Sequence, residues 1–226
     1  MRTTRNGALA LAGFALAACG GAGGGGGGGE DFVLPPEYEP FLTEDQIRAR
    51  LDDRSELLSL EETPSFSILP TGTADYSGTA VFNLDVDADG TTDHRLVGDI
   101  SLRAELLLAG DDITGSVGNI HARDDFVPTE NLEGGLTVTG ELDDGSKEIS
   151  GTISGLLDGY LGGDTLQVFS MDGSFDGVVR QRPNIQTNPF LPAGTDRAAA
   201  LTASASGALG GTLSGGTFNG GFAVDR

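Results

Sequence analysis

Apolar and polar residues alternate along most of the chain after residue 75, and this period of two is typical of strands with one buried face. The clearest run places seven residues on one face: Leu96, Gly98, Ile100, Leu102, Ala104, Leu106 and Leu108. The other face carries Asp99, Ser101, Arg103 and Glu105. Further strands are predicted near residues 76–84, 113–120, 136–142, 148–156, 165–180, 209–213 and 217–224.

The breaks between these runs are rich in Asp and Gly, which favour tight turns. No helical pattern alternates with the strands, so the sequence predicts an all-β fold with antiparallel pairing. We expect residues 65–226 to form an eight-stranded up-and-down β-barrel, because closure removes exposed sheet edges. Closure requires the strand that contains Phe222 and Val224 to pair with the first strand, near residues 80–84.

One long helix is predicted, over residues 43–60 within a segment 41–64. Thr43 can cap its start, and Gln46 is placed to complete a capping box. The pattern then gives one narrow apolar stripe on an otherwise charged helix: Ile47, Leu51 and Leu58. Such a helix is expected to lie on the surface and to pack through that stripe.

The first 18 residues have the layout of a secretory signal peptide, with Arg2 and Arg5 before an apolar run at 8–18. The run ends in Leu-Ala-Ala-Cys, at Cys19, the only cysteine in the chain. This motif resembles the lipobox of bacterial lipoproteins. The resemblance implies that the chain is cut before Cys19, that its sulfur is diacylated and that its new amino group is acylated. A soluble exported protein with a buried thiol is the alternative.

Residues 19–40 are expected to be a tether between the acylated Cys19 and the helix. Residues 20–29 are glycine except for Ala22, and residues 30–40 are acidic and rich in proline. The membrane is therefore an expected partner through the lipid anchor, since several acyl chains hold a protein firmly. No later apolar stretch approaches the roughly 20 residues that a membrane-spanning helix needs.

The chain is strongly acidic, with a formal net charge of −21 and a single lysine. Nucleic acid is excluded as a partner, because its phosphates require clustered Lys and Arg. The acidity is consistent either with attraction of cations and basic partners or with a solvated coat that keeps an exported protein soluble.

A short pattern, Gly-x-apolar-x-Gly, recurs at residues 151–155, 173–177, 211–215 and 216–220, and the chain ends in Gly-Gly-Phe-Ala-Val-Asp-Arg. Together with the lipobox and the glycine tether, these motifs resemble the C-terminal β-barrel of transferrin-binding protein B-like surface lipoproteins. The family's usual Phe-Tyr-Gly-Pro is replaced here by Phe-Asp-Gly at 175–177. The resemblance implies a closed eight-stranded barrel, anchored by lipid at the outer membrane or cell surface.

One acidic segment has the spacing of a calcium-binding loop. Its carboxylates occupy positions 1, 3, 5 and 9, with Gly90 at position 6, whereas Leu96 stands where the loop's bidentate Glu belongs. Calcium is thus a candidate cofactor, and an ordinary hairpin turn is the alternative. The candidate ligands are Asp85, Asp87, Asp89, Thr91 through its carbonyl, and Asp93.

No catalytic motif stands out, so the protein is not expected to be an enzyme. Neither Gly-x-Ser-x-Gly nor His-Glu-x-x-His occurs, and the two histidines, His94 and His121, are expected at strand ends facing solvent. We therefore expect an outer-membrane lipoprotein, facing periplasm or exterior, whose barrel binds an unknown protein or small molecule. A structural envelope lipoprotein without a soluble ligand and an envelope enzyme remain alternatives.

Overall fold

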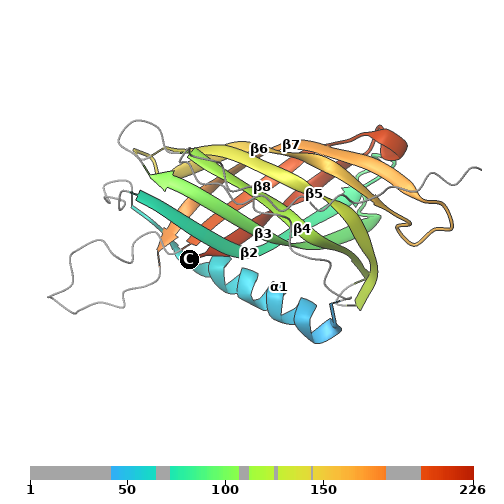
Figure 1. Ribbon diagram of the computed structural model, residues 1–226, viewed down its shortest axis with the longest axis horizontal. Coiled ribbons are helices and arrows are strands. Elements are labelled where there is room, and N and C mark those ends of the chain that lie inside the picture. Colours follow the sequence, from blue (N-terminus) through green and yellow to red (C-terminus); the bar gives the residue numbers. More distant parts are fainter. Residues whose placement is uncertain (1–41, 65–71, 107–111, 125–126, 144, 182–199) are drawn as a thin grey trace, which may run out of the picture. The chain divides into compact units, whose positions relative to one another are not determined.

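A closed ring of eight antiparallel strands forms the centre of the fold, which confirms the predicted all-β barrel (Figure 1). The computed structural model describes residues 42–64, 72–106, 112–124, 127–143, 145–181 and 200–226. The strands of the ring are β2 (Gly72–Asp85), β3 (His94–Leu106), β4 (Asp112–Asp124), β5 (Val127–Asp143), β6 (Glu148–Gly159), β7 (Gln167–Gln181), β8 (Ala200–Leu209) and β9 (Thr217–Asp225).

The last strand closes the ring as the sequence predicts. β9 pairs antiparallel with β2, with Phe222 opposite Ala80 and Val224 opposite Gly78. β9 also pairs with β8, and β8 pairs with β7. Each strand of the ring therefore has a hydrogen-bonded neighbour on both sides, and the backbone edges that promote aggregation are covered.

The barrel interior is one continuous hydrophobic cluster to which every strand of the ring contributes. Within it, aromatic rings from adjacent or next-but-one strands form edge-to-face pairs. The ring centroids of Phe82 and Phe218 are 5.9 Å apart, and those of Phe175 and Phe222 are 5.3 Å apart. All four side chains are almost fully buried. The alternating pattern therefore fills the interior with side chains.

The recurring glycines make room for these rings. Gly140 and Gly151 face each other across β5 and β6, and a Cβ on either would lie within 2.8 Å of the Phe175 ring. Gly173 and Gly207 are paired in the same way across β7 and β8, with the Phe218 ring 2.7 Å from the Cβ position. An aromatic ring lying over paired glycines restores the apolar contact that glycine lacks.

Outward positions of the strands are mostly Ser, Thr, Asp and Glu, and most of these side chains are exposed. Apolar side chains therefore line the inside of the barrel wall, and mostly polar side chains line its outside. Within the described ranges, no helix combines the length and the apolar character needed to cross a bilayer.

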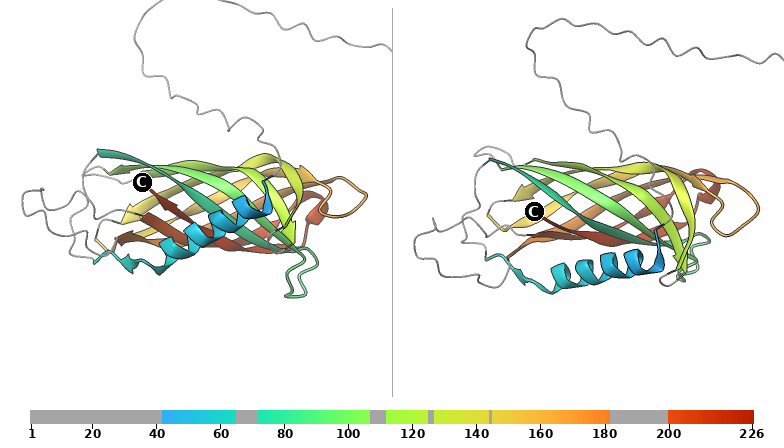
Figure 2. Two further views of the ribbon diagram at one scale, coloured as in Figure 1. Left: turned by 90° about the horizontal axis from the view of Figure 1, so that it is seen from below. Right: turned by 60° about the horizontal axis from the view of Figure 1, so that its bottom comes forward.

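Helix α1 (Glu44–Ser59) lies along the outside of the barrel (Figure 2). The predicted capping box is present: Thr43 N–H donates to Gln46 Oε1 at 2.8 Å, and Gln46 N–H donates to Thr43 Oγ1 at 3.3 Å. The helix packs on two apolar clusters, of which the first is Leu42, Ile47, Val81 and Val97, and the second is Leu57, Ala200 and Ala223. The predicted surface helix is thus confirmed.

The segment after the helix returns to the barrel wall. The short strand β1 (Glu61–Glu62) pairs with β7, and Thr63 N–H donates to Val179 O at 2.9 Å. Arg180 donates to Leu60 O and to Thr202 Oγ1, both at 2.6 Å. These bonds fasten the C-terminal end of α1 to the barrel.

One predicted strand is wrong. Residues 209–213 were expected to be extended, but β8 ends at Leu209 and Gly211–Leu213 is a 3₁₀ helix, η1. The true strand contains Ala203, Ala205 and their Ser neighbours, so its inward and outward positions differ little in hydrophobicity. Its pairing with β7 and β9 decides its conformation.

Candidate functional site

The acidic segment forms the turn between β2 and β3. Asp85, Asp87 and Asp89 each bring one carboxylate oxygen within 4.8 Å of the others. Ala88 (φ 58°) and Gly90 (φ 90°) adopt left-handed backbone conformations that fold the turn tightly. The segment is therefore a hairpin tip, and three of the five candidate ligands lie together there.

The same carboxylates are engaged by the backbone of the turn. Asp85 accepts hydrogen bonds from Asp89 N–H at 3.1 Å and from Gly90 N–H at 2.8 Å. Asp89 accepts from the hydroxyl and the N–H of Thr91, at 2.6 and 2.8 Å, and these bonds lower its pKa. Asp93 accepts from Val86 N–H at 2.8 Å. All of these hydrogen bonds lie within the turn, so its own side chains and backbone stabilise it.

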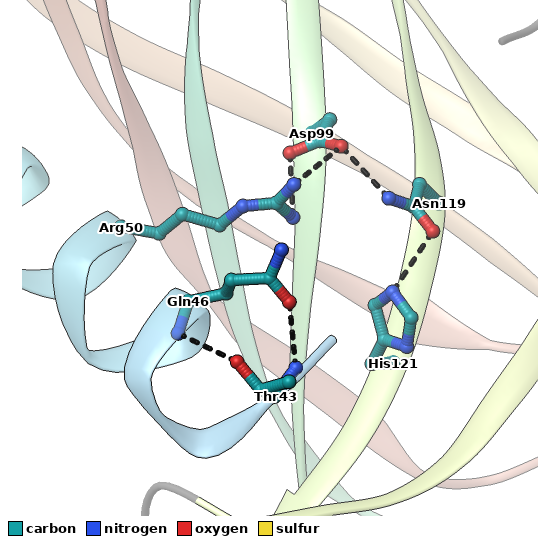
Figure 3. A network of polar contacts seen from close by, with 6 residues as sticks. All are labelled: Thr43, Gln46, Arg50, Asp99, Asn119 and His121. Carbon is teal, nitrogen blue, oxygen red and sulfur yellow. Dashed lines mark hydrogen bonds and ion pairs between the residues drawn. The ribbon is translucent and has the colours of Figure 1, made fainter. Parts of the chain in front are cut away.

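A second polar cluster lies between α1 and the outer face of the barrel (Figure 3). Arg50 makes a two-pronged contact with Asp99 on β3, with nitrogen–oxygen distances of 2.7 and 3.0 Å. Asn119 on β4 donates from Nδ2 to Asp99 at 2.9 Å, and its Oδ1 lies 2.8 Å from His121 Nε2. The chain of contacts thus runs from the helix across two strands.

A β-bulge places Asn119 in this network. The register of β3 and β4 shifts between Val97 and Asp99, and that of β4 and β5 shifts between Val117 and Ile120. Asn119 has a φ of 47°, a left-handed conformation that Asn tolerates better than most residues. Bulges of this kind re-aim a side chain, and here the amide comes to lie between Asp99 and His121.

His121 is fully buried, so the expectation that it faces solvent at a strand end is wrong. It occupies an outward position, but α1 and its cluster cover that part of the wall. Because Asn119 Oδ1 accepts, Nε2 of the ring must donate. Burial lowers the pKa of His121, and nearby Arg50 lowers it further, whereas Asn131 and Asp99 oppose this shift. The network therefore joins α1 to strands β3 and β4 through hydrogen bonds and an ion pair.

Two further arginines lie in this region. Burial lowers the pKa of Arg54 on α1, and the charge of Arg123 on β4 lowers it further. Two like charges, Arg54 on α1 and Arg123 on β4, therefore lie near each other in a strongly acidic chain. Sequence reasoning missed this cluster, because its members are spread over residues 50–123 and no spacing connects them.

The expected lipidation residue, Cys19, lies outside the described residues, as do the signal segment and the tether. No family model, curated protein or solved structure matches the chain. The candidate sites therefore rest on the chemistry of their own residues.

Proposed function

We propose that this chain is a lipid-anchored lipoprotein of the bacterial outer membrane or cell surface, and that its barrel is a binding or interaction module. The filled interior is the observation that supports a binding or interaction module. A barrel that encloses a small ligand keeps an open centre, whereas here every strand of the ring contributes buried apolar side chains to one continuous interior cluster. Recognition is therefore assigned to the outer surface and the loops.

The anchor rests on the lipobox-like residues that end at Cys19. Cys19→Ser should release the full chain from the membrane fraction, because the acyl chains supply nearly all of the membrane affinity. Ala22→Ser, in the adjacent tether, is the matched control and should leave fractionation unchanged. Retention of the Cys19→Ser protein in washed membranes at high salt would refute the anchor.

The module is tested with a photo-reactive amino acid placed at single exposed positions of the full-length protein in cells. Ser116, Thr152 and Ser206 sample the outer face of three strands. A binding module should give a discrete adduct at some positions and none at others, and excess untagged protein should compete for it. If no exposed position gives an adduct, the structural alternative replaces the proposal.

A further inference from the structure

The large apolar side chains that the described residues expose are gathered on one hairpin. They are Leu156 (64% exposed), Tyr160 (52%), Leu166 (45%) and Val168 (48%). We call these four residues the hairpin patch. They come from β6, from β7 and from the loop that joins them, and nowhere else does the described chain leave a large hydrophobic side chain so open.

The strand register places two residues of the patch, Leu156 and Val168, on one face of the barrel wall. Asp158 lies opposite Val168 and Leu156 lies opposite Ser170, and both rows point outward because Leu157 and Phe169 between them are buried inside. Leu156 and Val168 are therefore diagonal neighbours on the outer wall. Tyr160 and Leu166 are exposed in the loop just beyond the strand ends, next to the Gly159–Gln167 pair.

The hairpin is held in place by bonds to both sides. Tyr160 N–H donates to Glu130 on β5, and Gly163 N–H donates to Tyr160 O at 2.9 Å. Val168 N–H donates to Thr212 Oγ1 of η1 at 3.1 Å. Leu161, next to the exposed Tyr160, turns inward and is buried. The patch is thus preorganised, which reduces the entropy lost when a partner binds.

The hairpin patch differs in composition from the outward residues around it. Farther along the same strands, the outward residues are small and polar, among them Thr152, Ser154, Asp172 and Ser174. Isolated exposed hydrophobic residues are ordinary, but a contiguous group with a polar border is typical of an interaction site.

The electrostatic surroundings are acidic. Residues 156–170 contain no Lys or Arg, and Asp158 lies within the patch with Glu133 directly opposite on β5. Asp164 is exposed in the loop. Because adjacent strands are antiparallel, the turn that carries Asp87 and Asp89 lies at the same end of the barrel, as Figure 2 shows. The charged residues at 156–170 and on the facing strand β5 are all acidic, and they attract positive charge.

We propose that the hairpin patch is the docking surface of the module, and that its partner is a protein segment presenting apolar side chains flanked by Lys and Arg. This inference rests on the proposed function and names the partner's chemistry. Apolar anchors would cover the four side chains, and the flanking cations would meet Asp158, Glu133 and Asp164. A second copy of the same face, or anionic lipid, would instead bring like charges together.

The test uses the full-length protein in detergent and a fluorescent peptide that alternates Leu or Trp with Lys and Arg. One comparison peptide carries Glu and Asp in place of the cations, and another carries Ser in place of the apolar residues. Binding should be saturable for the basic apolar peptide and at least about tenfold weaker for each comparison peptide. Equal binding of the acidic peptide would overturn the assignment.

Substitutions in the hairpin patch then test where on the protein the peptide binds. Leu156→Ser with Val168→Ser should weaken binding about tenfold, as expected for central apolar anchors. Asp158→Asn should weaken it roughly threefold, with the loss disappearing at high salt. Asp176→Asn, the same change at an exposed position farther along β7, is the matched control and should have no effect. The inference fails if the variants melt like the parent protein and bind unchanged. It also fails if the patch variants abolish self-association or binding to anionic vesicles instead.

Cross-linking in cells separates this inference from the proposed function. A photo-reactive residue at Tyr160 should give the discrete adduct, and one at Ser206 should not. Adducts at other exposed positions but not at Tyr160 would keep the module and refute the hairpin patch. The absence of adducts at every exposed position would refute the module itself.

Discussion

The inner and outer faces of the barrel wall beneath α1 both contain fully buried side chains, but the two faces differ chemically. Inside, Phe222 is fully buried among other apolar side chains. Outside, His121 is just as buried, yet it belongs to a chain of contacts that includes the charged pair Arg50 and Asp99. The interior is apolar because strand alternation directs apolar side chains inward, whereas the outer face is buried because α1, a helix of 16 residues, covers it.

The difference shows that burial has two sources with different energetic consequences. Burying an aromatic side chain in a well-packed interior is strongly stabilising. A partly buried ion pair gains much less, because removing the charges from water offsets their attraction. We therefore expect the interior to dominate stability and the outer network to fix where α1 lies. The predictions below test this division.

The largest effect is expected inside the barrel. Phe222→Ala should lower the free energy of unfolding by about 3–5 kcal/mol, because it removes the edge-to-face contact with Phe175 and leaves a cavity. Leu57→Ala, on the underside of α1, should cost about 2 kcal/mol, since a surface helix can settle into the space. Both are measured by chemical denaturation. Equal losses of unfolding free energy in the two variants would contradict the proposed difference between the two faces.

The ion pair should give an intermediate effect. Asp99→Ala should cost about 1–3 kcal/mol, because it leaves Arg50 and the Asn119 amide without their acceptor. The double variant with Arg50→Ala should be less destabilised than the sum of the single variants, by about 1 kcal/mol. Arg48→Ala breaks an exposed pair with Glu44 and should cost at most about 0.5 kcal/mol. Additivity at Arg50 and Asp99 would contradict a coupled network.

A smaller effect is expected from pH. The folded protein lowers the pKa of His121 below its ordinary value of 6.5, so the unfolded chain binds the proton first as pH falls. The contribution of neutral His121 is fully present above pH 6.5 and declines as pH falls from there toward the folded pKa. Arg50 and Asp99 are the charges that face the ring.

This contribution is isolated by difference, since many carboxylates titrate nearby. The unfolding free energy of wild type minus that of His121→Gln should fall between pH 7 and pH 5. A flat difference curve would mean that the buried ring takes up its proton as readily as in the unfolded chain.

The smallest effect is expected at the exposed acidic turn, which belongs to neither face. Millimolar calcium should raise the melting temperature of wild type and of Asp87→Asn with Asp89→Asn by the same small amount, because calcium screens a very acidic protein. A larger shift in wild type alone would establish specific binding through the Asp85, Asp87 and Asp89 group, as mass action requires.

The sequence by itself determined the barrel and the start of the helix. Alternation with period two reveals which residues share a face, and the capping residues Thr43 and Gln46 act on their own neighbours. The closing strand could also be predicted from the sequence, because Phe222 and Val224 alternate with polar or small residues. Strand β8 could not be predicted, since alanine and serine give little contrast in hydrophobicity between its two faces.

The tertiary structure alone decided the burial of His121 and the grouping of the exposed hydrophobic residues. His121 stands at an outward position, and nothing in its neighbours tells that residues 42–60 will cover it. Leu156 and Val168 become neighbours only when β6 and β7 pair, and their exposure depends on no other element lying over them. Local patterns report on the chain nearby, whereas what covers an outer face depends on segments far away in the sequence.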